Sequence, residues 1–207
     1  MKIETLILGQ LQTNCYLVWD EKTLEAVIID PADEGTFIIQ KILDLKLKPK
    51  LILATHGHFD HILAATELKL AFNIPFLMHK ADLFLLNRTE NTAEHFLGMK
   101  VDPPPMVDKF LKDDDLIVFG REKLKVIETP GHTPGSICLY TKGFLFSGDT
   151  LFLAGVGRTD FAYGSRENLL KSIQKKLFKR PKETIVYSGH GPITTIGIEN
   201  LYFKSEL

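Results

Sequence analysis

The sequence predicts an α/β fold, a four-layer αββα sandwich in which two mixed sheets pack face to face between outer helices. Two observations support this fold class. Short β-branched and aromatic runs alternate with segments of helical spacing, and a set of strands followed by helices occurs in each half of the chain. The composition is that of an ordinary globular protein, with 44% apolar and 25% charged residues. A chain of 207 residues can bury one sizeable core, so we expect a single domain over residues 1–207.

The first half of the chain begins with strands and continues with alternating helices and strands. Alternating or continuous apolar runs predict each strand, and apolar residues three or four positions apart predict each helix. The expected elements are strands over 3–7, 15–19 and 26–29, a helix over 36–45, a strand over 50–55, a helix over 61–72, a strand over 74–78 and a short helix over 82–86.

Residues 87–115 interrupt this pattern. The segment has few apolar residues, a triple proline at 103–105 and an acidic triplet at 113–115. A loop this long is uncommon in a compact domain unless it is functional or partly helical. We interpret it as a surface excursion close to a functional site, and a simple solvated connector is an equally good interpretation.

The second half restarts with strands separated by turns. A glycine-rich loop over 149–164 then leads into a helix, by the same criteria of spacing. The expected elements are strands over 116–119, 123–128, 137–140 and 144–146, a helix over 166–178, a strand over 183–187 and a short closing helix.

The charge and cysteine content argue against several classes of protein. With 25 Lys and Arg against 26 Asp and Glu, the net charge of −1 disfavours a nucleic-acid partner. No apolar run approaches the roughly 18 residues of a membrane span, and residues 1–10 lack the features of a secretory signal. Cys15 and Cys138 form no CxxC pair, which fits a reduced, cytoplasmic chain. We therefore expect neither a nucleic-acid nor a membrane partner, and the sequence makes no prediction of the oligomeric state.

A dense group of ligand-type residues follows directly after the strand predicted over 50–55. His56 and His58 alternate along extended backbone, so their imidazoles can converge on one side. Asp60 and His61 stand where the next helix is expected to begin, so they can point toward a second metal. Imidazole and carboxylate groups suit zinc and also iron. The spacing therefore predicts a metal site.

Three more ligand-type residues occupy turns at the ends of predicted strands. They are His132 within 129–135, Asp149 within 147–150 and His190 within 188–192. Strand-end loops at one edge of a rigid sheet are a common place for functional side chains. His79 and His95 lack such a setting, and we interpret both as structural.

The pattern His-x-His-x-Asp-His at 56–61, followed by the three strand-end residues, resembles the metallo-β-lactamase superfamily. The resemblance extends from residues 13–18 to His190 and implies the αββα fold. It implies two divalent metal ions, with zinc as the expected metal and iron or manganese also suited to the ligands. It assigns His56, His58 and His132 to one metal, Asp60, His61 and His190 to the second, and Asp149 to a bridge between them. True β-lactamases generally lack this bridging carboxylate.

Within that superfamily the segments 129–135, 147–152, 157–161 and 189–192 are most similar to the type II glyoxalases, or hydroxyacylglutathione hydrolases. The resemblance implies hydrolysis of a small-molecule thioester such as S-lactoylglutathione by a hydroxide held between two metals, with Asp60 orienting it. Paired metals lower the pKa of bound water to about 7. A thiolate leaves without prior protonation because its pKa is about 8.5, which suits a site with no obvious general acid.

Two departures from the glyoxalase pattern concern the substrate. The chain continues only briefly beyond His190, so we expect no helical glutathione-binding domain after it. Arg158 stands where the family has a lysine, and Asp160 where it has an aromatic residue. Arg158 can pair with a substrate carboxylate through two parallel hydrogen bonds.

The sequence is also compatible with other functions. Residues 157–161 are also similar to the persulfide dioxygenases, in which a single iron would be held here by His56, His132 and Asp149. A lactone or phosphodiester hydrolase and a non-catalytic metal-binding module are further alternatives. The last of these predicts a closed coordination sphere without exchangeable water.

Overall fold

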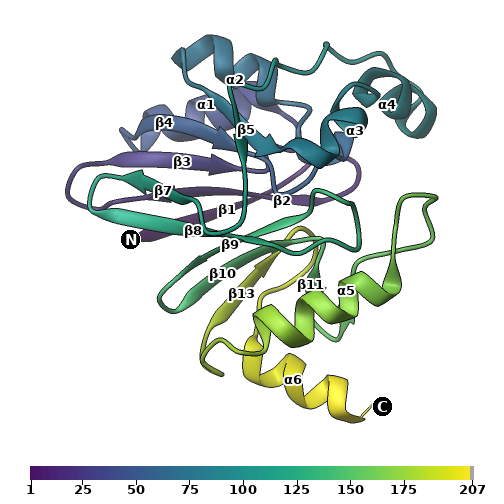
Figure 1. Cartoon of the computed structure of the whole chain (residues 1–207). Helices are drawn as coiled ribbons and strands as arrows, with labels where there is room; N and C mark the ends of the chain where they lie inside the picture. Colours follow the sequence, from purple (N-terminus) through teal and green to yellow (C-terminus); the bar gives the residue numbers. More distant parts are fainter. Residues whose placement is uncertain (206–207) are drawn as a thin grey trace.

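The computed structural model of the chain describes residues 1–205 and consists of two six-stranded sheets packed face to face, with helices on both outer faces (Figure 1). This arrangement confirms the predicted four-layer sandwich. The first sheet has the order β1 (Lys2–Leu8), β2 (Thr13–Trp19), β3 (Glu25–Ile29), β4 (Lys48–Leu53), β5 (Phe76–His79) and β6 (Lys109–Leu111). The second has the order β14 (Thr194–Thr195), β13 (Ile185–Ser188), β10 (Phe144–Gly148), β9 (Ile137–Thr141), β8 (Glu122–Glu128) and β7 (Leu116–Phe119).

Both sheets are mixed, as predicted. In the first sheet β1, β2 and β3 pair antiparallel, whereas β3 to β6 pair parallel. In the second sheet only β10 and β13 pair parallel. The carboxyl ends of parallel strands meet at one sheet edge, so the loops after β4, β10 and β13 can bring their side chains together.

The helices form the two outer layers (Figure 1). In the part of the chain that the structure describes, no helix is long and apolar enough to cross a membrane. The helices are α1 (Gly35–Asp44), α2 (Ala65–Phe72), α3 (Leu83–Leu86), α4 (Thr89–Leu97), α5 (Arg166–Ser172) and α6 (Ile196–Ser205). A π-helical segment, η3 (Ile173–Leu177), continues α5, so that the two together take up most of the helix predicted over 166–178. Short 3-10 turns occur at η1 (Phe59–His61) and η2 (Lys80–Asp82), and β11 (Leu151–Phe152) pairs with β12 (Gly155–Val156).

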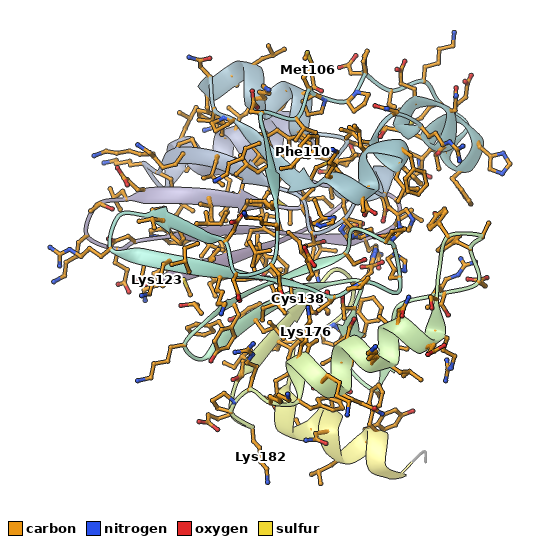
Figure 2. All side chains as sticks on the ribbon, viewed as in Figure 1. Met106, Phe110, Lys123, Cys138, Lys176 and Lys182 are labelled. Carbon is orange, nitrogen blue, oxygen red and sulfur yellow. The ribbon has the colours of Figure 1, made fainter. Side chains whose placement is uncertain are left out.

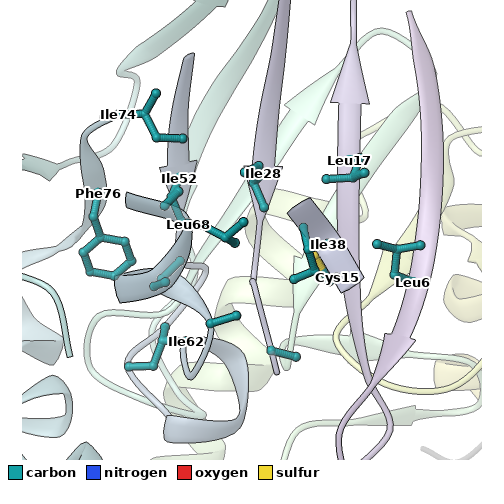
Figure 3. Close-up of a cluster of buried hydrophobic side chains, with 14 of the residues drawn as sticks. Leu6, Cys15, Leu17, Ile28, Ile38, Ile52, Ile62, Leu68, Ile74 and Phe76 are labelled. Atoms are coloured by element: carbon teal, nitrogen blue, oxygen red, sulfur yellow. The ribbon is translucent and has the colours of Figure 1, made fainter. Parts of the chain in front are cut away.

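Three separate apolar clusters correspond to the three interfaces of the sandwich. The first lies between the first sheet and α1 and α2 and includes Leu17 and Ile38 (Figure 3). The second lies between the sheets and includes Val18, and the third lies between the second sheet and α5 and α6. Successive residues of β2 therefore face different clusters. This explains why the strand is apolar throughout, because both of its faces are covered.

The helix predicted over 61–72 begins later, at Ala65. The η1 turn takes residues 59–61, and the amides of Leu63 and Ala64 donate to the carbonyls of Ala32 and Pro31 rather than to a preceding helical turn. These bonds hold the segment against the loop after β3. His61 thus lies in a buried turn before the helix, whereas His58 lies in the extended segment that precedes this turn.

The segment over 87–115 is more ordered than the predicted surface excursion. It contains α4 and supplies β6, which pairs parallel with β5 at the edge of the first sheet. Phe96 of α4 stacks on Phe59 of η1, with ring centroids 5.9 Å apart. The sequence pattern is weak here because α4 buries only Thr89 and Ala93, and β6 buries one residue.

Candidate metal centre

All seven predicted ligands lie together at one edge of the two sheets. The first group consists of three imidazoles, with His56 Nε2 3.0 Å and His132 Nε2 2.9 Å from His58 Nδ1. His56 and His58 follow β4, and His132 lies in the loop between β8 and β9. The extended backbone at His58 (φ −71°, ψ 144°) keeps the two neighbouring rings on the same side, as their spacing predicts.

A second group combines one carboxylate and two imidazoles. Asp60 Oδ2 lies 3.5 Å from His61 Nε2 and 3.4 Å from His190 Nε2. Thr13 Oγ1 donates a hydrogen bond of 3.1 Å to the same carboxylate oxygen. The structure therefore brings the start of β2, the η1 turn and the loop after β13 to one point.

Asp149 faces histidines of both groups. Its Oδ1 lies 3.5 Å from His61 Nε2, and its Oδ2 lies 3.6 Å from His132 Nε2 and 3.8 Å from His190 Nε2. The residue follows β10, next to the parallel strand β13 that ends before His190. Its position between the groups is the one that a bridging carboxylate requires.

Each of the five histidines also has its outer ring nitrogen at hydrogen-bond distance from an oxygen. Such a partner fixes the orientation of a metal-binding imidazole and leaves the inner nitrogen as the ligand. The pairs are His56 Nδ1 with Thr55 Oγ1 (3.1 Å), His58 Nε2 with the Tyr163 hydroxyl (2.8 Å), His61 Nδ1 with Asp30 Oδ2 (3.1 Å), His132 Nδ1 with the Arg158 carbonyl (2.8 Å) and His190 Nδ1 with the Leu11 carbonyl (3.1 Å).

The inner atoms of this arrangement fit metal ions. Two of them, His61 Nε2 and Asp149 Oδ1, are buried and have no hydrogen-bond partner among the described residues. A buried polar atom without a hydrogen-bond partner costs free energy, and a bound metal ion would supply the missing partner. A set of five imidazole nitrogens and two carboxylates suits zinc, iron or manganese.

Burial controls the charge of the first group. Burial, reinforced by neighbouring imidazoles, lowers the pKa of His56 well below its usual value and that of His58 to about 3. Both rings are therefore neutral at physiological pH. Their nitrogen lone pairs are available, as metal coordination requires.

Carboxylates control the charge of the second group. Burial alone would lower the pKa of His61, but Asp60, Asp149 and Asp30 outweigh it and raise the pKa to about 10. Burial likewise acts to raise the pKa of Asp60, and the His61 imidazole reverses this and holds it below the usual range. The local field thus stabilises positive charge, which favours a bound cation.

Sequence reasoning missed three residues that support this centre. Asp30 accepts hydrogen bonds from the amide and the hydroxyl of Thr55 (2.7 Å each) in addition to its contact with His61. Its place directly after β3 was a usable signal, because the other ligand-bearing loops also follow strands. Tyr163, whose hydroxyl meets His58, and Asp82, which accepts a hydrogen bond from the amide of Gly57 between His56 and His58, gave no local signal, since their partners lie far away in the sequence. His79 and His95 lie outside the centre: His79 pairs with Glu128, and His95 is exposed on α4.

Arg158 reaches the centre through its main chain, while its guanidinium turns outward. The side chain binds Asp160 through two hydrogen bonds of 3.0 and 2.8 Å and lies over the Phe161 ring. Phe161 in turn contacts the rings of His58 and His132 and stacks on Tyr163. The first group is therefore bordered by an aromatic wall, which we define as Phe161 and Tyr163.

A substitution at Gly189 would test how closely the centre is packed without removing a ligand. A Cβ at this position would overlap Asp149 Oδ1 and lie 2.8 Å from His61 Cε1. We expect Gly189→Ala to weaken metal binding by about 10–100-fold, the usual range for changes around metal ligands. Chelator competition measures the effect. Gly155→Ala is the control, because the nearest atom there is 3.9 Å away; equal affinity of the two variants would contradict the prediction.

The two cysteines are unsuited to nucleophilic catalysis. Both are fully buried and unpaired, and Cys138 lies inside the second half of the molecule (Figure 2). Burial raises the pKa of the Cys138 thiol to about 11 and that of Cys15 above its usual range. We expect a disulfide reagent at pH 8 to label neither thiol in the native protein and both in guanidinium chloride, because the thiolate is the reactive form. Rapid labelling of the native chain, with loss of activity, would contradict this.

Comparison with known proteins agrees with the architecture and the centre. The sequence profile of the metallo-β-lactamase superfamily matches residues 8–190. The hydroxyacylglutathione hydrolase GloC of Haemophilus influenzae is 38% identical over 96% of this chain and 95% of that protein. The BLEG-1 B3 metallo-β-lactamase is 37% identical, with a TM-score of 0.89 and 96% of each chain covered. TTHA1623, solved in a di-iron-bound form, is 36% identical, with a TM-score of 0.87 over 95% of this chain and 96% of that chain. Because the profile spans most of the chain and these relatives align along nearly all of it, this chain is a metallo-hydrolase of the metallo-β-lactamase superfamily.

Proposed function

We propose that the protein is a thioester hydrolase with two metal ions, for which S-lactoylglutathione is the model substrate. The observation that carries the proposal is the pair of ligand groups that share Asp149. The similarity to a hydroxyacylglutathione hydrolase supports the choice of substrate. The two unpaired thiols, Cys15 and Cys138, support our placing of the protein in the cytoplasm.

His56, His58 and His132 would hold the first ion, Asp60, His61 and His190 the second, and Asp149 would bridge them. When bound, such a pair supplies a nucleophile at neutral pH and polarises the acyl carbonyl. We expect zinc, with iron or manganese as substitutes; the di-iron form of TTHA1623 supports iron as one of them.

The residues around the centre would position the reacting groups. Asp60, held by the hydrogen bond from Thr13 Oγ1, would orient the attacking water by accepting a hydrogen bond from it. The aromatic wall of Phe161 and Tyr163 excludes water from one side of the first group and offers an apolar face to the acyl group. A thiolate leaves without a proton because its pKa is about 8.5, so no residue of the chain has to act as a general acid.

The carboxylate of a substrate can still reach Arg158. The ion pair between Arg158 and Asp160 is largely exposed, with 71% and 65% of the two side chains accessible. Solvent screens an exposed ion pair and leaves it weak, so a substrate carboxylate can displace Asp160 at little cost. We therefore retain Arg158 as a substrate-binding residue in the proposal.

The test is the release of free thiol from S-lactoylglutathione by protein loaded with zinc, manganese or iron. Because the chain's own thiols are buried, a thiol-detecting dye reports the product. His58→Ala is the inactive reference, and His95→Ala, on the exposed side of α4, is the matched control. A wild-type rate no higher than that of His58→Ala would refute the proposal. Persulfide-dependent oxygen uptake with one iron per chain would instead indicate the dioxygenase reaction.

A further inference from the structure

Asp82 joins two of the loops that carry the candidate ligands. It ends the η2 turn, and its side chain is fully buried, with an exposed fraction of 0%. Its Oδ2 accepts hydrogen bonds from the amide of Gly57 (2.9 Å) and the hydroxyl of Thr133 (2.6 Å), and its Oδ1 accepts from the amide of Gly135 (2.6 Å). Gly57 separates His56 from His58, and Thr133 follows His132.

These bonds span the two halves of the sandwich. The loop at 55–58 follows β4 of the first sheet, whereas the loop at 129–136 connects β8 and β9 of the second. Both glycines permit a close approach, because a Cβ at Gly57 would lie 3.0 Å from Asp82 Cβ and one at Gly135 would lie 2.7 Å from Asp82 Oδ1. One carboxylate thus fixes the distance between the two loops.

The burial of this carboxylate has an energetic cost. Burial raises the pKa of Asp82 above its usual value, although the three hydrogen-bond donors act in the opposite direction. A buried charged group is tolerated only where its hydrogen bonds are satisfied. The three donors therefore have to stay close to the carboxylate, and this requirement fixes the positions of both loops.

We propose that Asp82 is a positioning residue for the first metal ion, because it sets the ring nitrogens of His56 and His58 against that of His132. The inference rests on the proposed metal centre. It does not depend on the identity of the substrate. Loss of one acceptor at Asp82 lets the two loops move apart, and the three nitrogens then no longer meet at one point.

Asp20 provides a matched control. It is also buried, and it also joins a turn of the first sheet to a turn of the second, by accepting from the amides of Lys22 (2.8 Å) and Arg121 (2.7 Å). It follows the carboxyl end of β2, whereas Thr13, which contacts Asp60, begins that strand. Asp20 is therefore a loop-bridging aspartate far from the ligands.

The experiment compares the zinc affinities of Asp82→Asn and Asp20→Asn by competition with a chromophoric chelator. An asparagine at 82 keeps the shape but replaces one carboxylate oxygen by an N–H donor, so Gly135, or Gly57 together with Thr133, loses its acceptor. We expect the first zinc equivalent to bind about 10–100-fold more weakly to Asp82→Asn. Asp20→Asn should change that affinity by less than about twofold, while losing thermal stability in the same way.

Thr133→Val is the second variant, to be used if Asp82→Asn does not fold. It removes the hydroxyl that donates to Asp82 and leaves the carboxylate in place. It should weaken zinc binding in the same direction but less, and shift the absorption bands of the cobalt-substituted protein. Wild-type affinity in Asp82→Asn, or in Thr133→Val should the former not fold, would overturn the proposal, as would an equal loss in Asp20→Asn. Wild-type protein that binds zinc but leaves S-lactoylglutathione intact would refute the proposed substrate without affecting this comparison.

Discussion

Asp149→Asn is expected to lower kcat/KM for thioester hydrolysis by about 10³-fold or more and to reduce the metal content from two equivalents to one or fewer. Asp149 faces histidines of both groups, at 3.5 Å from His61 and 3.6 Å from His132. The amide removes the negative charge and turns an N–H group toward a ring nitrogen that has to act as a ligand. Electrostatic stabilisation by metal ions contributes several kcal/mol, and about 4 kcal/mol corresponds to this loss in rate.

Elemental analysis and steady-state kinetics on the same preparation check this expectation. Asp160→Asn is the matched control, because its carboxylate is exposed and binds Arg158 rather than a histidine. It should keep both metal equivalents. An Asp149→Asn variant with two metals and wild-type kinetics would show that the bridge is not needed.

Removal of metal is expected to lower Tm by roughly 8–16 °C for each ion lost, relative to protein in zinc at about 1,000 times its Kd. Binding of one ion at that ratio stabilises the native state by about 4.1 kcal/mol, and each kcal/mol shifts Tm by about 2–4 °C in a chain of this size. The structural reason is the set of buried inner atoms, His61 Nε2 and Asp149 Oδ1 among them, that have no protein partner.

Calorimetry with zinc or with a chelator measures this shift. Magnesium provides a comparison, because it prefers oxygen ligands and should stabilise a histidine-rich centre only weakly. His58→Ala should show a smaller zinc effect than the wild type. A difference below 2 °C between metal-loaded and metal-free wild-type protein would contradict the expectation.

The fold was predictable because its signals are local. Strands such as β2 and β3 are continuous apolar runs with a turn between them, and the layers follow from the repeated order of strands and helices. The helix α4 and the short strand β6 escaped prediction because they bury few residues and are held by neighbours. The start of α2 shifted because backbone bonds to Pro31 and Ala32 replace helical ones, and no local pattern encodes them.

The seven ligand-type residues could be named from the sequence because their residue types are restrictive and each follows a strand. The structure brings all seven together, and their roles as ligands remain a prediction. The supporting residues could not be named in the same way. Asp82 meets donors 25, 51 and 53 positions away, and Tyr163 meets His58 at a separation of 105. Contacts of that range depend on how the sheets dock, which spacing along the chain does not reveal.

Both ligand groups draw their members from the two halves of the chain in the same ratio. Each takes two residues from the segment after β4 and one from the second half: His132 in the first group and His190 in the second. Neither half can assemble a complete group by itself. A slip of one sheet past the other would displace the third member of both groups together. Metal binding therefore depends on the alignment of the two sheets, and loss of metal during gradual denaturation should report the separation of the two halves of the chain.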